Sequence, residues 1–186
     1  MSQNTPQKWF NLEERFFKNM DAELLDNLRG NMEKAETAER LMEVTGIQNA
    51  ELAAAIVELK VTVETLAAFR LSPLVAVAWA DDRVEENERY SILKAAEASG
   101  ISAEDPSMAL LEAWTKHRPQ TELLEAWCEY AQALGESLGA EQRQVLKSEM
   151  LGQIQKVAEA NGGVLGFGSV CNSEKELIAK VSEALG

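Results

Sequence analysis

The chain has 186 residues, enough for one well-buried domain, and 46% of them are hydrophobic, as is ordinary for a folded globular protein. Aspartate and glutamate outnumber lysine and arginine by 31 to 18, which gives a net charge of -13. Such a surface repels the phosphates of nucleic acids and of anionic lipids, so neither is expected as a partner. Cations and the basic surfaces of other proteins are the natural partners.

The sequence shows no targeting signal and no cysteine motif of a metal site. Residues 1–30 contain no basic stretch followed by an apolar run, and no segment approaches the ~20 apolar residues of a membrane span. Cys128 and Cys171 are the only cysteines and have no metal-binding spacing, which is typical of buried thiols in a reducing compartment. We therefore expect a cytoplasmic protein with no direct membrane insertion.

The N-terminal third of the chain predicts helices. Leu12, Phe16, Met20, Leu24 and Leu28 recur every four residues and predict a long amphipathic helix. Its wide apolar stripe must be covered by the domain, by a partner or by a second copy of the chain, so a homodimer is one alternative. A second helix is predicted over 33–44, followed by a helix over 49–59 and a short turn over 62–69.

Helix starts and stops are marked by small, polar and proline residues. Gly46 and Gly100 are suited to the left-handed position that ends a helix, and Asn49 is a good N-cap. Ser72 and Asp105 each precede a proline, so each is predicted to cap a new helix, the second of which reaches about residue 116. Later helices are predicted over 121–134, from after Gly139 to 160, and from Ser173 onward. With no strand alternation, the predicted fold class is all-α with about nine helices.

Two segments of the chain are similar to each other. Residues 77–82, VAWADD, align with residues 157–162, VAEANG. Glu88 then aligns with Glu174, and Gly100 with Gly186, so the second copy has six extra residues in its loop. Each copy reads as a helix, a tight polar turn and a second helix, which indicates a degenerate duplication.

The first turn resembles the motif of a known family. Residues 80–88, ADDRVEENE, follow an apolar helix and are similar to the A-D-G-x-apolar-x-x-x-E motif of the TerB-like, tellurite-resistance-associated proteins. Asp82 stands at the usual glycine position, and aspartate is among the few other residues that tolerate a positive φ. The second copy keeps the glycine at Gly162 but has Asn161 in place of the acid. The resemblance covers residues 70–186, and residues 1–69 form an additional N-terminal helical region expected to pack on that core.

The resemblance implies a pseudo-duplicated helix-loop-helix bundle without catalytic activity. It also implies a role in bacterial stress-response and tellurite-resistance systems, metal binding through acidic residues, and protein partners in a membrane-linked complex. Asp81, Glu85 and Glu88 are therefore the candidate metal ligands, with Ca²⁺ or Mg²⁺ as the cation because hard cations take carboxylate oxygens. An EF-hand is excluded, since counting from Asp81 puts Ile92 at the twelfth position, where a glutamate is required. The alternative is that these acids only cap and charge a helix N-terminus.

No residue pattern of an enzyme is present. His117 is the only histidine and has no nucleophile motif near it, and the glycines of residues 162–168 follow a helix rather than a strand. Trp79, Trp114 and Trp127 fall in predicted helices and are expected in the core, while Trp9 could contact a partner. The predicted function is a non-enzymatic cytoplasmic binding or scaffold module. A carboxylate metal-dependent hydrolase and a small-ligand sensor with a pocket between the repeats are the alternatives.

Overall fold

The computed structural model describes residue 30 and residues 33–160 and 172–186, and all its regular elements are helical. They are a helical segment at 33–45, α2 (Ala50–Glu58), the 3-10 helix η1 (Val63–Thr65), α3 (Leu66–Arg70), α4 (Ser72–Ala78), α5 (Glu86–Ala98), α6 (Pro106–Lys116), α7 (Glu122–Ser137), α8 (Ala140–Ala160) and α9 (Asn172–Ala184). Within these ranges the all-α prediction is confirmed. The predicted helix at 12–28, Trp9, the glycine-rich segment and Cys171 lie outside the described residues.

Most predicted helix boundaries are confirmed by the groups that cap them. The Asn49 side chain accepts a hydrogen bond from the backbone N–H of Leu52 at 3.0 Å, and Asp105 accepts one from Ser107 at 2.7 Å. Gly100 has a φ of 87°, and the next residue, Ile101, donates its N–H to a carbonyl one turn back in α5. Side-chain and backbone partners therefore satisfy the polar groups that a helix end leaves open.

Ser72 does not cap α4, so that prediction was wrong. Helix α4 begins at Ser72 itself, with Leu71 in the N-cap position, and the Ser72 hydroxyl is buried without a hydrogen-bond partner. The physical reason is that α3 leads directly into α4, so Leu71 ends one helix and starts the next. An N-cap needs extended backbone to turn its side chain onto the following N–H groups, and Ser72 is already helical.

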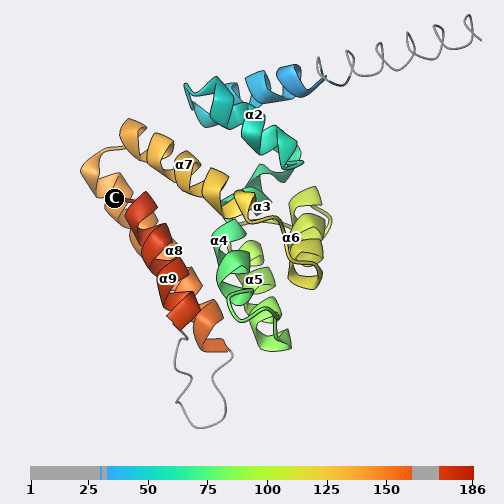
Figure 1. Ribbon diagram of the computed structural model, residues 1–186, viewed down its shortest axis with the longest axis vertical. Helices are drawn as coiled ribbons and strands as arrows, with labels where there is room; N and C mark the ends of the chain where they lie inside the picture. Colours follow the sequence, from blue (N-terminus) through green and yellow to red (C-terminus); the bar gives the residue numbers. More distant parts are fainter. Residues whose placement is uncertain (1–29, 31–32, 161–171) are drawn as a thin grey trace, which may run out of the picture.

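The helices pack around one core, with the two predicted repeats against each other (Figure 1). Helices α8 and α9 lie side by side; α4 contacts both of them, and α5 contacts α8. Helix α7 crosses one end, where it contacts α2, α4 and α9. The largest fully buried apolar side chains come from both halves of the chain: Phe69, Ile56, Leu74, Ile92, Leu111, Ile154, Val61, Val75, Val77, Val157 and Val181. In the part described, no helix is both long and apolar enough to cross a membrane.

The tryptophans join helices at the edge and centre of this core. Trp127 is 3% exposed, and its indole N–H donates to the carbonyl of Arg70 at 3.1 Å. Trp79 and Trp114 are only partly buried, and the Trp79 indole N–H donates to the Trp114 backbone carbonyl at 2.7 Å. The expected core position is thus confirmed for Trp127, while the other two lie at the core's edge. The bond from Trp79 ties the end of α4 to α6.

Candidate functional site

The predicted site is the turn between α4 and α5. The backbone N–H of Asp82 bonds to the Trp79 carbonyl at 3.1 Å, and Asp82 has a φ of 68°. Asp82 thus adopts the left-handed conformation for which glycine is the usual choice, as the sequence predicted. The Asp81 carboxylate accepts the N–H of Arg83 at 3.3 Å, which holds the turn in place from within.

The turn ends in a reciprocal capping box. Glu85 is the N-cap residue of α5, and its backbone N–H donates to the Glu88 carboxylate at 2.8 Å. The Glu85 side chain in turn accepts the backbone N–H of Glu88. Two of the three predicted ligands therefore serve as helix caps, which is the structural alternative stated for them. The capping box engages only one carboxylate oxygen of Glu88, Oε2, and its other oxygen takes no part in it.

Glu88 is the most unusual residue of the site because its carboxyl group is buried. It is 2% exposed, and burial, the largest cause, raises its pKa from 4.5 to about 7. The hydrogen bond from Glu85 opposes that rise, whereas the carboxylates of Asp81, Glu174 and Glu85 each add to it. The negative charge of Glu88 is thus disfavoured both by lost hydration and by like charges.

Glu174 brings the second repeat into the site. It lies in the first turn of α9, is 8% exposed, and is close enough to raise the pKa of Glu88. The sequence predicted no role for it as a ligand, although its alignment with Glu88 was the signal that could have placed it. The structure brings together Asp81, Glu85 and Glu88, which were predicted, and Glu174, which was not.

Two arginines pair with acids of the turn other than Glu88. The Arg83 guanidinium lies 3.7 Å from an Asp81 carboxylate oxygen and 3.0 Å from a Glu85 oxygen. Arg118, from the connection between α6 and α7, forms an ion pair with Asp82. Among the described residues no ion pair reaches Glu88, and no cationic side chain is among the causes that shift its pKa.

The turn has the donor atoms that a divalent cation needs, but it does not arrange them around a cation. Its donors are carboxylate oxygens, the ligands that Ca²⁺ and Mg²⁺ prefer. However, Arg83 already pairs with Asp81 and Glu85, and no three Asp, Glu, His or Cys side chains in the described ranges are arranged to hold a metal ion. A cation would therefore have to displace the Arg83 side chain before it could use these oxygens together.

The described residues include one histidine, His117, and one cysteine, Cys128. His117 is exposed at the end of α6. Cys128 is buried in α7, and burial raises the pKa of its thiol, which lowers its reactivity.

Comparison with known protein families, with curated proteins and with solved structures finds no match for this chain.

Proposed function

We propose that this protein is a non-enzymatic, cytoplasmic binding module of a bacterial stress-response system, and that a divalent cation modulates it at Asp81, Glu85 and Glu88. The observation that supports the proposal is the burial of Glu88 among three other carboxylates. Like charges in a poorly hydrated position destabilise one another unless a proton or a cation neutralises them. The TerB-like motif of residues 80–88 supports the stress-response role.

Protein partners of this module should carry basic surfaces. The chain has a net charge of -13, and the acidic turn lies at the surface, where Asp82 is exposed. Charge complementarity of this kind raises association rates and fixes orientation more than it adds affinity. A partner in a membrane-linked complex, as the resemblance implies, would then associate more slowly as salt is added.

Calorimetry with Ca²⁺ and with Mg²⁺ tests the cation site. We expect native protein to bind weakly, on the order of 10⁻⁴ to 10⁻³ M, because the set of ligands is incomplete. Arg83→Gln removes the competing guanidinium and should tighten binding by up to about fivefold, the effect of one exposed ion pair. Asp81→Asn combined with Glu88→Gln should abolish it.

The control for that titration is Glu86→Gln. Glu86 lies in the same first turn of α5, but its side chain points into solvent with an exposed fraction of 91%. Its loss should leave cation binding unchanged. If neither native protein nor Arg83→Gln shows heat or a thermal shift at millimolar cation, the acids of this turn are helix caps and surface charges only.

Growth of the bacterial host tests the stress-response role separately. Cells without this protein should grow less well in tellurite, and the Asp81→Asn, Glu88→Gln chain should restore growth less than the native chain does. Equal growth with and without the protein would contradict the stress-response role. The cation site would then be judged by calorimetry alone.

A further inference from the structure

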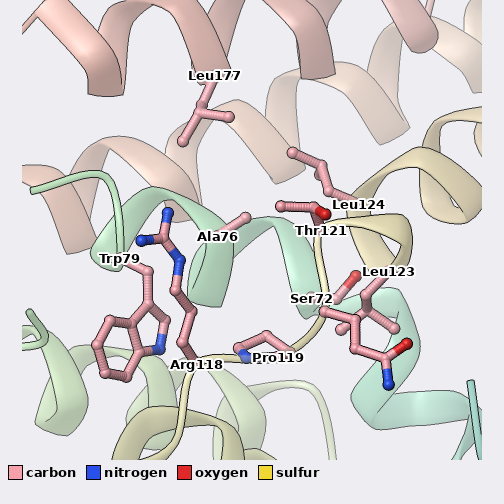
Figure 2. Close-up of a pocket in the computed structure, with 10 residues that line it drawn as sticks. Ser72, Ala76, Trp79, Arg118, Pro119, Thr121, Leu123, Leu124 and Leu177 are labelled. Atoms are coloured by element: carbon pink, nitrogen blue, oxygen red, sulfur yellow. The ribbon is translucent and has the colours of Figure 1, made fainter. Parts of the chain in front are cut away.

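A pocket lies where the first repeat, the second repeat and the connection between α6 and α7 meet (Figure 2). Its cavity volume is about 90 Å³. The lining residues are Ser72, Ala76, Trp79, Arg118, Pro119, Gln120, Thr121, Leu123, Leu124 and Leu177. Figure 2 shows Leu177 reaching from α9 toward α4, which carries Ala76. The walls are therefore mainly apolar, with a few polar groups among them, as in many small-molecule sites.

Ser72 is the first polar group of this pocket. It is 2% exposed, and its hydroxyl oxygen is the one buried side-chain polar atom, among the described residues, that has no hydrogen-bond partner. Such orphaned groups are rare in proteins, because an unmade hydrogen bond inside the fold is costly. A hydroxyl lining a cavity acquires its missing partner when a molecule in the cavity offers an oxygen or nitrogen.

Arg118 is the charged group of the pocket. Figure 2 shows its guanidinium extending past Pro119 toward the level of Ala76, at the end of the pocket where Trp79 lies. Ser72 and Leu123 lie at the other end in that view. The Arg118 head is half-exposed and pairs with Asp82, which is itself exposed. An incoming carboxylate would compete with Asp82 for this guanidinium, as arginine binds planar anions well.

We propose that this pocket binds a short aliphatic carboxylate that carries a hydroxyl or carbonyl group at its far end. The carboxylate pairs with Arg118, the carbon chain lies among Leu123, Leu124 and Leu177, and the second oxygen bonds to Ser72. The cavity of about 90 Å³ limits the buried part of the ligand to a chain of a few carbon atoms, with the carboxylate at the mouth beside the half-exposed Arg118. The site goes beyond the proposed cation binding and uses none of the three carboxylates assigned to it.

Titration of full-length protein with γ-hydroxybutyrate, butyrate and butanediol, followed by NMR of the leucine methyl groups, tests the pocket. γ-Hydroxybutyrate should shift the methyls of Leu124 and Leu177 and bind most tightly. Arg118→Gln should weaken both carboxylates roughly tenfold or more, the usual effect of losing a charge-assisted hydrogen bond. Ser72→Ala should weaken γ-hydroxybutyrate alone, to the level of butyrate.

Two further variants separate this site from a general charge effect. Asp82→Asn removes the competing carboxylate and should tighten both carboxylates a few-fold. Arg83→Gln removes a positive charge from the same turn but not from the pocket, so it should change neither affinity. The proposal is overturned if no probe shifts the pocket methyls at millimolar concentration, if butanediol binds as tightly as γ-hydroxybutyrate, or if Ser72→Ala weakens butyrate equally.

Discussion

Glu88→Gln should make the protein more stable than the native chain above pH 7, by up to about 3 kcal/mol. The native carboxyl group has its pKa raised from 4.5 to about 7 by burial, and by the charges of Asp81, Glu174 and Glu85. Each unit of pKa difference corresponds to about 1.4 kcal/mol. Glutamine is neutral at every pH, and its amide oxygen can still accept the Glu85 N–H.

The sign of the pH dependence follows from proton binding. Because the folded pKa of Glu88 lies above the unfolded one, the folded state binds more protons between about pH 4.5 and 7. The contribution of Glu88 to stability is therefore fully present below about pH 4.5 and is lost as the pH rises to about 7. Native protein and Glu88→Gln should have similar stability near pH 4.5 and differ most near pH 8.

Urea unfolding at several pH values, followed by circular dichroism, measures this difference. The matched control is Glu86→Gln, which removes the same charge two residues earlier from a side chain that is 91% exposed. It should change the free energy of unfolding by less than about 0.5 kcal/mol at any pH. A Glu88→Gln chain that is less stable than native at pH 8 would show that the carboxylate is satisfied in its buried position.

A cation should act on the native chain in the same direction as the substitution. If Ca²⁺ or Mg²⁺ binds beside Glu88, it stabilises the folded state more as its concentration rises above its dissociation constant. The gain should be small in Glu88→Gln, since the variant no longer carries the charge that the cation neutralises. The two measurements together thus separate a proton-binding carboxyl group from a cation site.

Helix boundaries were predicted well because their causes are local. Asn49 and Asp105 cap helices through atoms two or three residues away, and Gly100 ends α5 through its own φ. The turn conformation at Asp82 is local in the same sense. Such features depend on side-chain and backbone preferences that the sequence displays directly.

The features that were missed depend on distant parts of the chain. Ser72 fails as a cap because α3 runs into α4, and its unpaired hydroxyl lines a pocket together with residues of α7 and α9. Arg118 meets Asp82 across 36 residues, and Glu174 reaches Glu88 from the other repeat. Composition and periodicity do not reveal contacts between distant residues. The alignment of Glu88 with Glu174 was the one sequence feature that related the two glutamates.

Trp127→Ala should destabilise the protein by about 3–5 kcal/mol, the usual result of removing a buried aromatic side chain. Trp127 is 3% exposed, so the alanine leaves a cavity where α7 meets the end of α3. It also leaves the carbonyl of Arg70 without the indole N–H that donates to it. Urea unfolding of the variant and native protein under the same conditions measures the loss.

Trp127→Phe separates the hydrogen bond from the packing. Phenylalanine keeps most of the apolar volume but has no donor, so it should cost about 1–3 kcal/mol, the range for an acceptor left unpaired in the interior. Trp114→Phe is the matched control, because its side chain is only partly buried and its backbone carbonyl still accepts the Trp79 bond. That control should cost less than the Trp127 change; equal losses would mean that the Arg70 bond contributes nothing.

Trp127→Phe also tests whether the packing of α7 on α3 and α4 supports the pocket. The Arg70 carbonyl lies two residues before Ser72, so the Trp127 bond helps to fix the point at which α3 passes into α4. Trp127→Phe should therefore weaken γ-hydroxybutyrate binding while leaving the pH dependence that Glu88 causes unchanged, since separated sites act additively. If the variant lost both γ-hydroxybutyrate binding and the pH dependence of stability, α7 would position the acidic turn as well, through the whole length of α4.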